Sequence, residues 1–252
     1  MFIGEMYKMI KVFINGQSGT TGLRIKERLL QRDDIKLLQI DENKRKNIDE
    51  IRKYINESDI TFLCLPDDAA REAVNLIDKE NDNTKIIDAS TAHRTENGWA
   101  YGFPELSPEF RKQVKTNRRI ANPGCYASGF ISIVYPLIAH GVIAKDYPLT
   151  CFAVSGYSGG GKSAIAQYEN AERDAELDSP RQYALTQQHK HLKEMKAVTG
   201  IEKMPVFSPM ICDYKCGMVV SVPFFTDMLC GGLKPADVRE ILAEHYKNEK
   251  LI

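Results

Sequence analysis

The amino-acid sequence predicts an α/β protein in two parts, a parallel-sheet half over residues 1–122 and an α+β half over residues 123–252. In the first half, short β-rich runs alternate with helical patterns, which is typical of a parallel sheet with right-handed crossovers. That alternation stops after Asn122-Pro123-Gly124, and the strands beyond it are less regularly spaced. We therefore predict a domain boundary near residue 122.

The first half begins with a compact apolar strand, followed at once by a glycine-rich loop and a helix. Leu23, Leu29 and Leu30 are expected on the buried side of that helix. The predicted strands are residues 9–14, 35–40, 59–65 and 85–88, and the predicted helices are residues 21–31 and 69–78. In the second half we expect an apolar helix over residues 127–139, strands over residues 151–154 and 218–223, and a charged terminal helix.

Composition excludes several classes of protein. Thirty-four basic residues balance 34 acidic ones, so no overall charge favours nucleic acid or a membrane surface as a partner. No apolar run reaches the roughly 18 residues that a spanning helix needs, and residues 1–6 lack the basic region of a signal peptide. Six scattered cysteines do not form the pattern of a disulfide scaffold. The expected location is the reducing cytoplasm.

Gly16, Gly19 and Gly22 lie three residues apart, directly after the first strand and at the start of the first helix. A Rossmann-like dinucleotide fold needs small residues there, because the backbone turns tightly and approaches a pyrophosphate at the helix N-terminus. An ordinary loop is the alternative, since the spacing is not the commoner Gly-x-Gly-x-x-Gly. The expected cofactor-binding residues of this loop are Gly16, Ser18, Gly19, Thr20, Thr21 and Gly22.

The end of the second strand bears on the choice between NAD and NADP. Asp41 is about where an acidic residue holds a ribose hydroxyl in NAD enzymes. Lys44 and Arg45 follow it and would instead neutralise a 2′-phosphate. A solvated basic turn is the alternative. The residues favour NADP slightly, with Lys44 and Arg45 as the phosphate-binding pair.

Cys125 is the candidate nucleophile. It follows Pro123-Gly124 and falls at or near the start of the predicted apolar helix, where the dipole and backbone N–H groups favour the thiolate. The same N–H groups would stabilise an oxyanion after attack on a carbonyl. Cys64 and Cys151 lie in apolar strand patterns and are expected to be inert core residues. The remaining cysteines show no usual zinc spacing, so no metal site is predicted.

A nucleophilic cysteine needs a proton carrier, and residues 189–194 offer one. If a helix starts there, His191 and Glu194 are three residues apart and share a face, so the carboxylate orients the imidazole. Surface histidines in a polar loop are the alternative. His189, His191 and Glu194 are therefore the candidate acid–base group.

Two more polar segments follow predicted strands. Residues 90–94 are expected at the carboxyl edge of the first sheet, where ligands bind, and Arg94 is the candidate for holding a phosphate or carboxylate. Residues 156–163 match the Gly-x4-Gly-Lys-Ser pattern of a phosphate loop. Because they lie in the less regular half, a nucleoside triphosphatase is a minor alternative.

As an ordered set, these segments resemble the N-acetyl-γ-glutamyl-phosphate reductases of arginine biosynthesis, in particular their shorter second type. The segments that carry the resemblance span nearly the whole chain: residues 15–22, 88–95, 101–105, 122–129, 155–162 and 189–194. The resemblance implies a Rossmann-like NADP-binding domain and an α+β domain of the semialdehyde-dehydrogenase type, which carries catalysis and the subunit contacts of a homo-oligomer.

The resemblance also implies the reaction, in which NADPH reduces N-acetyl-5-glutamyl phosphate to N-acetylglutamate 5-semialdehyde and phosphate is released. Cys125 matches the family's nucleophile, which forms a thioester. His189, His191 and Glu194 match its His-x-His-x-x-Glu segment, with His191 as general acid and base. Members of the family continue past residue 252, so this sequence is expected to lack their C-terminal segment.

Three alternatives stay open. Aspartate-semialdehyde dehydrogenase uses the same thioester chemistry on a related fold, although the Ser-Thr-Ala-His-Arg and His-x-His-x-x-Glu segments favour the acetylglutamyl substrate. A non-catalytic NADP-binding regulatory protein would not need a cysteine at a helix start beside a His–Glu pair. A cysteine hydrolase would not need the glycine loop.

Overall fold

The computed structural model describes residues 9–252, which form two compact units. The first unit holds residues 9–102 and 114–122, and the second holds residues 103–113 and 123–252. Residues 103–113 therefore pack with the second unit, whereas the sequence boundary at residue 122 assigned them to the first. The predicted lack of a signal peptide concerns residues outside the described part.

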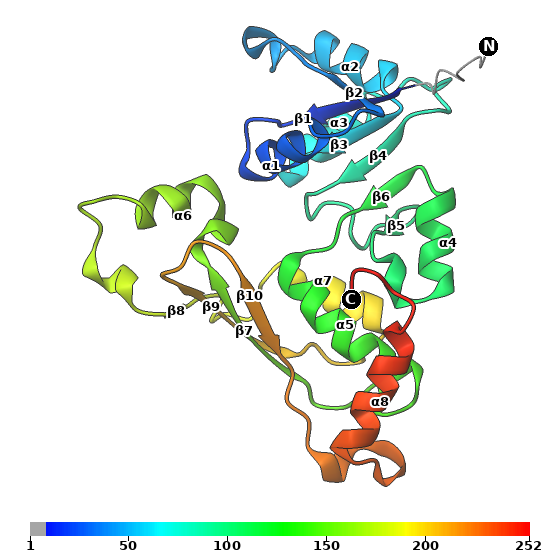
Figure 1. Cartoon of the computed structure of the whole chain (residues 1–252), viewed down its shortest axis with the longest axis vertical. Coiled ribbons are helices and arrows are strands. Elements are labelled where there is room, and N and C mark those ends of the chain that lie inside the picture. Colours follow the sequence, from blue (N-terminus) through cyan, green and yellow to red (C-terminus); the bar gives the residue numbers. More distant parts are fainter. Residues whose placement is uncertain (1–8) are drawn as a thin grey trace, which may run out of the picture. The chain divides into compact units, whose positions relative to one another are not determined.

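The first unit is built on a six-stranded sheet in the order β2-β1-β3-β4-β6-β5, and every strand pairing in it is parallel. Figure 1 shows the strands with their helices. The strands are β1 (Ile10–Asn15), β2 (Ile35–Leu38), β3 (Ile60–Leu63), β4 (Lys85–Asp88), β5 (Ala100–Tyr101) and β6 (Arg119–Ala121). The alternation of strands and helices predicted this parallel sheet.

Three helices connect the first strands: α1 (Thr20–Leu29), α2 (Ile48–Glu57) and α3 (Asp67–Val74). Their apolar side chains and those of the strands form a core around Phe13, Ile55 and Leu63. The sequence prediction missed α2, although Asn47 caps it by accepting from the N–H groups of Asp49 and Glu50.

The expected buried face of α1 is wrong in part. Leu23 is 43% exposed and Leu30 59% exposed, and Gly22 is the buried residue of the helix. Close backbone packing at Gly22, rather than a leucine stripe, holds the start of α1 against the loop that follows β1.

The second unit contains a four-stranded mixed sheet in the order β10-β7-β9-β8. β7 pairs with β9 in parallel and with β10 in antiparallel orientation. The strands are β7 (Thr150–Gly156), β8 (Arg181–Gln182), β9 (Val206–Cys212) and β10 (Met218–Ser221). β7 is therefore longer than the predicted run 151–154, and β10 is shorter than the predicted run 218–223.

Helices cover part of the second unit: α5 (Cys125–Ala139), α6 (Gly161–Tyr168), α7 (His191–Thr199) and α8 (Pro235–Tyr246). α5 packs against α7, α8 and β10. Its Phe130, Ile131, Val134 and Leu137 are fully buried. α5 starts at Cys125, two residues before the predicted start. α4 (Pro108–Thr116) spans the border of the two units.

No helix among residues 9–252 is long and apolar enough to cross a membrane.

Gly22→Ala tests the close packing at the start of α1. Alanine favours a helix interior over glycine by about 1 kcal/mol, but a Cβ here would overlap the carbonyl oxygen of Gly16. Overpacking against backbone costs about 1–3 kcal/mol, so the net effect expected in urea unfolding is a loss of stability. Glu27→Ala, at an exposed position of the same helix, is the control and should change stability by less than about 0.5 kcal/mol. A Gly22→Ala protein as stable as the parent would contradict this account.

Candidate active site

The glycine loop after β1 fits a dinucleotide. Gly16 has a φ of +90°, and a Cβ there would overlap the carbonyl oxygen of Cys64. Gly19 caps α1 in an extended conformation, and the first turn of α1 carries no acidic side chain. Gly19 makes no side-chain cap hydrogen bond to the backbone N–H groups of this helix start, which is the arrangement that accepts a pyrophosphate.

The two predicted phosphate-binding cations lie in and directly after the short helix η1 (Glu42–Lys44). Lys44 forms an ion pair with Glu50 at 2.8 Å. Arg45 pairs with Glu42 and also donates to the hydroxyl of Ser18, 3.3 Å away. Arg45 is thus the cation that reaches the glycine loop, and its position fits a phosphate bound beside that loop.

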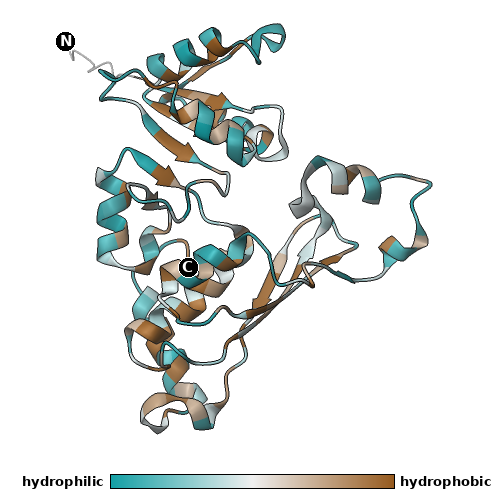
Figure 2. Ribbon diagram, turned by 180° about the vertical axis from the view of Figure 1, so that it is seen from behind, coloured by the Kyte–Doolittle hydropathy of each residue, from teal (hydrophilic) through white to brown (hydrophobic). Residues whose placement is uncertain are grey.

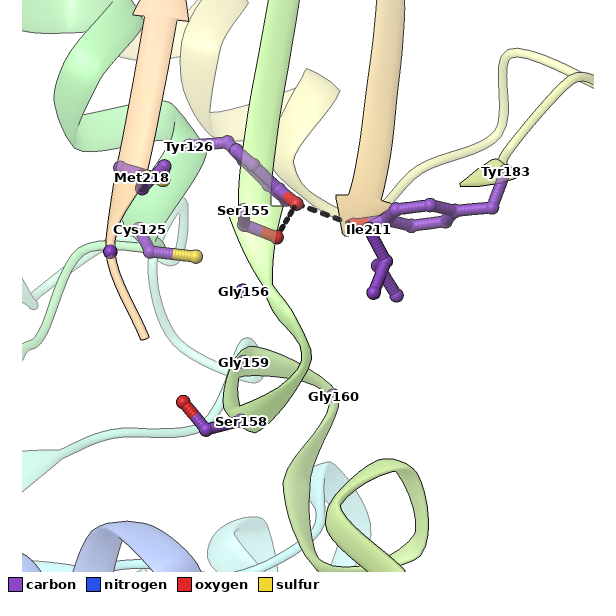
Figure 3. A pocket seen from close by; sticks show the side chains of 11 residues that line it. Cys125, Tyr126, Ser155, Gly156, Ser158, Gly159, Gly160, Tyr183, Ile211 and Met218 are labelled. Carbon is purple, nitrogen blue, oxygen red and sulfur yellow. Dashed lines mark hydrogen bonds between the residues drawn. The ribbon is translucent and has the colours of Figure 1, made fainter. Parts of the chain in front are cut away.

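Cys125 is the first residue of α5, and its side chain is exposed. It lies on the wall of a cavity of about 350 Å³ in the second unit, which Figure 3 shows from close by. The lining residues are Cys125, Tyr126, Ser155, Gly156, Ser158, Gly159, Gly160, Tyr183, Ile211, Gly217 and Met218. A thiol at a helix N-terminus and at the edge of a cavity has the surroundings of a nucleophile.

Glu194 and His191 lie on α7, which begins at His191. Glu194 is 1% exposed, and one of its carboxylate oxygens accepts from the backbone N–H of Gly124 at 3.1 Å. Its other oxygen lies 4.0 Å from Nε2 of His191. The carboxylate therefore connects the residue before Cys125 with the imidazole.

His189 has a structural role at the start of the same helix. Its Nδ1 accepts from the backbone N–H of His191 at 3.1 Å, so this nitrogen does not carry a proton. The two imidazole rings lie 4.6 Å apart between centroids, in an edge-to-face arrangement. The structure thus brings the three predicted acid–base residues together.

Three hydroxyl groups that the sequence prediction missed border the Cys125 cavity. Tyr126 and Ser155 are 2.6 Å apart between their hydroxyl oxygens, and Tyr183 donates to Tyr126 at 3.1 Å. Tyr126 directly follows the nucleophile candidate in sequence, which could have drawn attention to it. Ser155 and Tyr183 are separated from it by 29 and 57 residues and carry no local signal.

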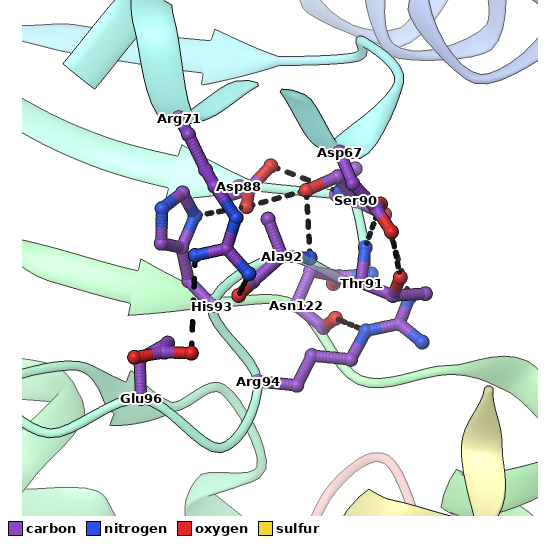
Figure 4. Close-up of polar contacts among 11 residues, drawn as sticks. Asp67, Arg71, Asp88, Ser90, Thr91, Ala92, His93, Arg94, Glu96 and Asn122 are labelled. Carbon is purple, nitrogen blue, oxygen red and sulfur yellow. Dashed lines mark hydrogen bonds and ion pairs between the residues drawn. The ribbon is translucent and has the colours of Figure 1, made fainter. Parts of the chain in front are cut away.

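Arg94 lies in the loop after β4, as predicted. Its Nε donates to the carbonyl of Asn122 at 2.9 Å, and Nη2 lies 3.4 Å from the carbonyl of Ala89. The loop itself is fixed by Asp88, which is completely buried and accepts from the N–H and hydroxyl groups of Ser90. Figure 4 shows these contacts.

His93 completes this network. Its Nδ1 lies 2.6 Å from the Asp88 carboxylate, and its ring stacks on Trp99 with the centroids 4.0 Å apart. The neighbouring Thr91 is held by Asp67, and the carbonyl of Ala92 accepts from Arg71. The segment that carries Arg94 is therefore rigidly held on the first unit.

The segment that matches a phosphate loop lies elsewhere. It follows β7 of the mixed sheet, and Gly156, Ser158, Gly159 and Gly160 line the Cys125 cavity. A Cβ at Gly156 would lie 2.7 Å from the backbone nitrogen of Cys216. Close packing against the loop between β9 and β10 therefore explains the glycine at this position.

Two other thiols differ from Cys125. Burial raises the pKa of Cys151 to about 12, and burial with the nearby Asp88 charge raises the pKa of Cys64 to about 12. Both thiols are uncharged at neutral pH, as expected of inert residues.

Two family models match the chain. "Semialdehyde dehydrogenase, NAD binding domain" matches residues 8–114, and "Semialdehyde dehydrogenase, dimerisation domain" matches residues 125–252. Similar solved structures include aspartate semialdehyde dehydrogenase from Francisella tularensis, with a TM-score of 0.66, 13% identity, and coverage of 94% of this chain and 81% of that one. The enzyme from Candida albicans with NADP has a TM-score of 0.62 and 15% identity, and the match covers 94% and 76% of the two chains. These structures show the fold.

Curated relatives are more similar in sequence. The N-acetyl-gamma-glutamyl-phosphate reductase of Trichormus variabilis is 45% identical over 246 residues, which cover 96% of this chain and 76% of the relative. The protein of the same name from Brucella ovis is 44% identical over 243 residues, which cover 96% and 78% of the two chains. The chain therefore belongs to the semialdehyde dehydrogenase family and, within it, to the N-acetyl-γ-glutamyl-phosphate reductases.

Proposed function

We propose that this chain reduces N-acetyl-5-glutamyl phosphate to N-acetylglutamate 5-semialdehyde with NADPH and releases phosphate, as a step of arginine biosynthesis. The observation that carries the proposal is the position of Cys125, an exposed thiol at the first residue of α5 and on the wall of a cavity. The names of relatives at 44–45% identity support the substrate. The likeness to aspartate semialdehyde dehydrogenases, at 13–15% identity, does not favour an aspartyl substrate.

Cys125 acts as the nucleophile in this proposal. Its thiolate attacks the acyl carbon, the bond from carbon to the phosphate oxygen breaks, and phosphate leaves with the electron pair, which gives a thioester. The backbone N–H groups in the first turn of α5 stabilise the negative charge on the carbonyl oxygen during the attack. A bound dinucleotide would supply the hydride for reduction of the thioester. Cys125 departs as a thiolate when its C–S bond breaks, and the carbonyl of the aldehyde forms in the same step.

His191 carries the proton that Cys125 loses and regains. Glu194 supports this role because its buried carboxylate lies 4.0 Å from Nε2 and orients the imidazole. His189 holds the first turn of α7 through the N–H of His191, so its contribution is to position that residue. Glu194 also fixes the loop before Cys125 through Gly124.

The dinucleotide is assigned to the first unit and the catalytic side chains to the second. The six residues of the glycine loop predicted from the sequence hold the pyrophosphate, and Arg45 with Lys44 neutralises the 2′-phosphate of NADP. Arg94 binds an anionic group of the substrate, supported by the two backbone carbonyls that orient its guanidinium. The reducing cytoplasm suits a reaction that depends on a thiolate.

A homo-oligomer is proposed from the second unit. One face of its sheet carries Phe152, Val206 and Val219, which are 42%, 56% and 63% exposed. Figure 2 shows the hydrophobic colouring along these strands. An exposed apolar sheet face is typical of a protein–protein interface, and the match to a dimerisation domain over residues 125–252 supports a second copy of the chain as the partner.

Turnover in the reverse direction tests the reaction. Mixing the full chain with N-acetylglutamate 5-semialdehyde, NADP⁺ and phosphate should produce NADPH, followed by its absorbance. Cys125→Ala should lower kcat by at least about 10³-fold, and His191→Asn by about 10²–10⁴-fold. Cys230→Ala, at an exposed cysteine outside the cavity, is the control. Equal activity of Cys125→Ala and the parent would rule out the thioester route.

Alkylation distinguishes the thiols. At pH 8, a thiol with a pKa of about 12 is ionised to only about 1 part in 10⁴, and the thiolate is the reacting form. Iodoacetamide should therefore modify Cys125 first and leave Cys64 and Cys151 intact until urea unfolds the chain, as read by peptide mass spectrometry. The exposed Cys216 and Cys230 give the rate expected from exposure alone. A Cys125 slower than these two would contradict thiolate stabilisation by α5.

Val219→Asp tests the sheet face. A charge in the centre of an apolar interface should shift the wild-type oligomer to monomer in size-exclusion chromatography with light scattering. The matched control is Ile48→Asp on α2, because Ile48 is also 63% exposed. A monomeric parent, or an unchanged mass for Val219→Asp, would overturn the proposed interface.

A further inference from the structure

A chain of hydroxyl groups runs along one wall of the Cys125 cavity. Tyr183 donates to Tyr126 at 3.1 Å, Tyr126 and Ser155 are 2.6 Å apart, and the hydroxyl of Ser155 lies 3.5 Å from the carbonyl oxygen of Met210. Tyr126 is 4% and Ser155 9% exposed, so water has little access to their hydroxyl groups. The chain thus begins at the half-buried Tyr183 and ends at a backbone carbonyl.

One direction of hydrogen bonding satisfies every contact in the chain. A backbone carbonyl only accepts, so Ser155 donates to Met210. Tyr183 is the donor in its contact with Tyr126. Tyr126 therefore accepts from Tyr183 and gives its own proton to Ser155. With this arrangement all three hydroxyl protons point along the wall and toward Met210.

As a consequence, the Tyr183 oxygen offers the cavity a lone pair and no proton. Burial raises the pKa of Tyr183 most, and the hydrogen bond to Tyr126 raises it further, so the phenol keeps its proton at neutral pH. A neutral acceptor in a partly apolar cavity pairs well with a neutral N–H group and poorly with an ether or ester oxygen, because two acceptors repel.

The other lining residues restrict the ligand further. None of the residues that line the cavity carries a carboxylate. An ammonium group would therefore lose water without gaining a carboxylate as its counter-charge in this cavity. An amide N–H brings a donor without a charge, and Cys125, the proposed nucleophile, lines the same cavity.

We propose that Tyr183 is a specificity-determining residue that accepts a hydrogen bond from a neutral N–H of the ligand. Tyr126 and Ser155 are positioning residues, because they direct the hydroxyl proton of Tyr183 away from the cavity. This inference rests on the proposed function, because the N–H is taken to be that of the acetylated amino group in N-acetyl-5-glutamyl phosphate. The enzyme selects an N-acylated substrate over an ester analogue or a free amine through this oxygen.

Equilibrium binding tests the inference without turnover. Calorimetry on the full chain would compare N-acetyl-L-glutamate with 2-acetoxyglutarate, in which an ester oxygen replaces the amide N–H. The wild type should bind the amide about tenfold more tightly, the size of one neutral hydrogen bond. Tyr183→Phe should reduce this ratio to about one, because the acceptor is gone.

Tyr126→Phe is the decisive variant, because it keeps Tyr183 and the packing of the ring. Without the Tyr126 oxygen, the Tyr183 proton turns toward the cavity and donates, so the ester should bind as well as the amide or better. Ser155→Ala should also lower the ratio of the affinity for the amide to the affinity for the ester. Tyr157→Phe is the matched control, since that hydroxyl donates to Glu169 and lies outside the chain; its ratio should equal that of the wild type.

Three results would overturn the inference: an equal affinity of the wild type for both acids, no binding of either acid, or an unchanged ratio in Tyr126→Phe. A uniform loss of affinity for both acids in Tyr126→Phe would show a packing role only and would also overturn it. Reverse turnover of N-acetylglutamate 5-semialdehyde is measured separately. A wild type that turns over this aldehyde but does not discriminate between the acids therefore refutes the inference and leaves the proposed function intact.

Discussion

The hydrogen bond from the N–H of Gly124 to the carboxylate of Glu194 is the interaction on which the catalytic unit depends. Glu194 is almost completely buried, and a buried carboxylate without partners costs several kcal/mol. The N–H of Gly124 lies at the start of α5, where backbone N–H groups have no partner within the helix, and it donates to this carboxylate at the positive end of the helix dipole. The carboxylate is thereby satisfied by the same helix start that holds Cys125.

This interaction also sets the packing of the two helices. α5 and α7 are in contact, and the shared hydrogen bond fixes the start of one against the first turn of the other. His191 at the first position of α7 is consequently placed by the backbone, and His189 strengthens the same turn by accepting from its N–H. A shift of either helix would break the hydrogen bond from Gly124 to the Glu194 carboxylate, so the geometry around Cys125 resists change.

The sequence predicted the parts of this site that depend on local structure. The position of Cys125 at a helix start follows from Pro123-Gly124 before an apolar run, and the shared face of His191 and Glu194 follows from their spacing. The glycine loop and the parallel sheet follow from strand and helix alternation. Pairing across long sequence distances could not be predicted. Tyr126 meets Ser155 only because α5 packs on the sheet beside β7, and no local pattern encodes that contact.

The wrong expectation for α1 has the same origin. An apolar stripe predicts which face of a helix is buried, but at the start of α1 the contact is between backbone atoms, at Gly22 and the Gly16 carbonyl. The domain boundary differs for a related reason, since residues 103–113 pack with α5 through the short helix η2 (Pro104–Leu106). Composition and local sequence patterns do not predict such contacts, because they form between segments that are separate in the sequence.

Both units use a buried carboxylate to hold a functional loop, although their folds differ. Asp88 ends β4 and accepts from Ser90 and His93, which fixes the segment that carries Arg94. Glu194 does the same for the segment before Cys125. In each case a change of the loop conformation would break hydrogen bonds to a carboxylate in a low-dielectric interior, which is costly. A buried carboxylate in each unit therefore stabilises the conformation of the loop beside it. The proposed reactive side chains are thus held in place by groups that do not react.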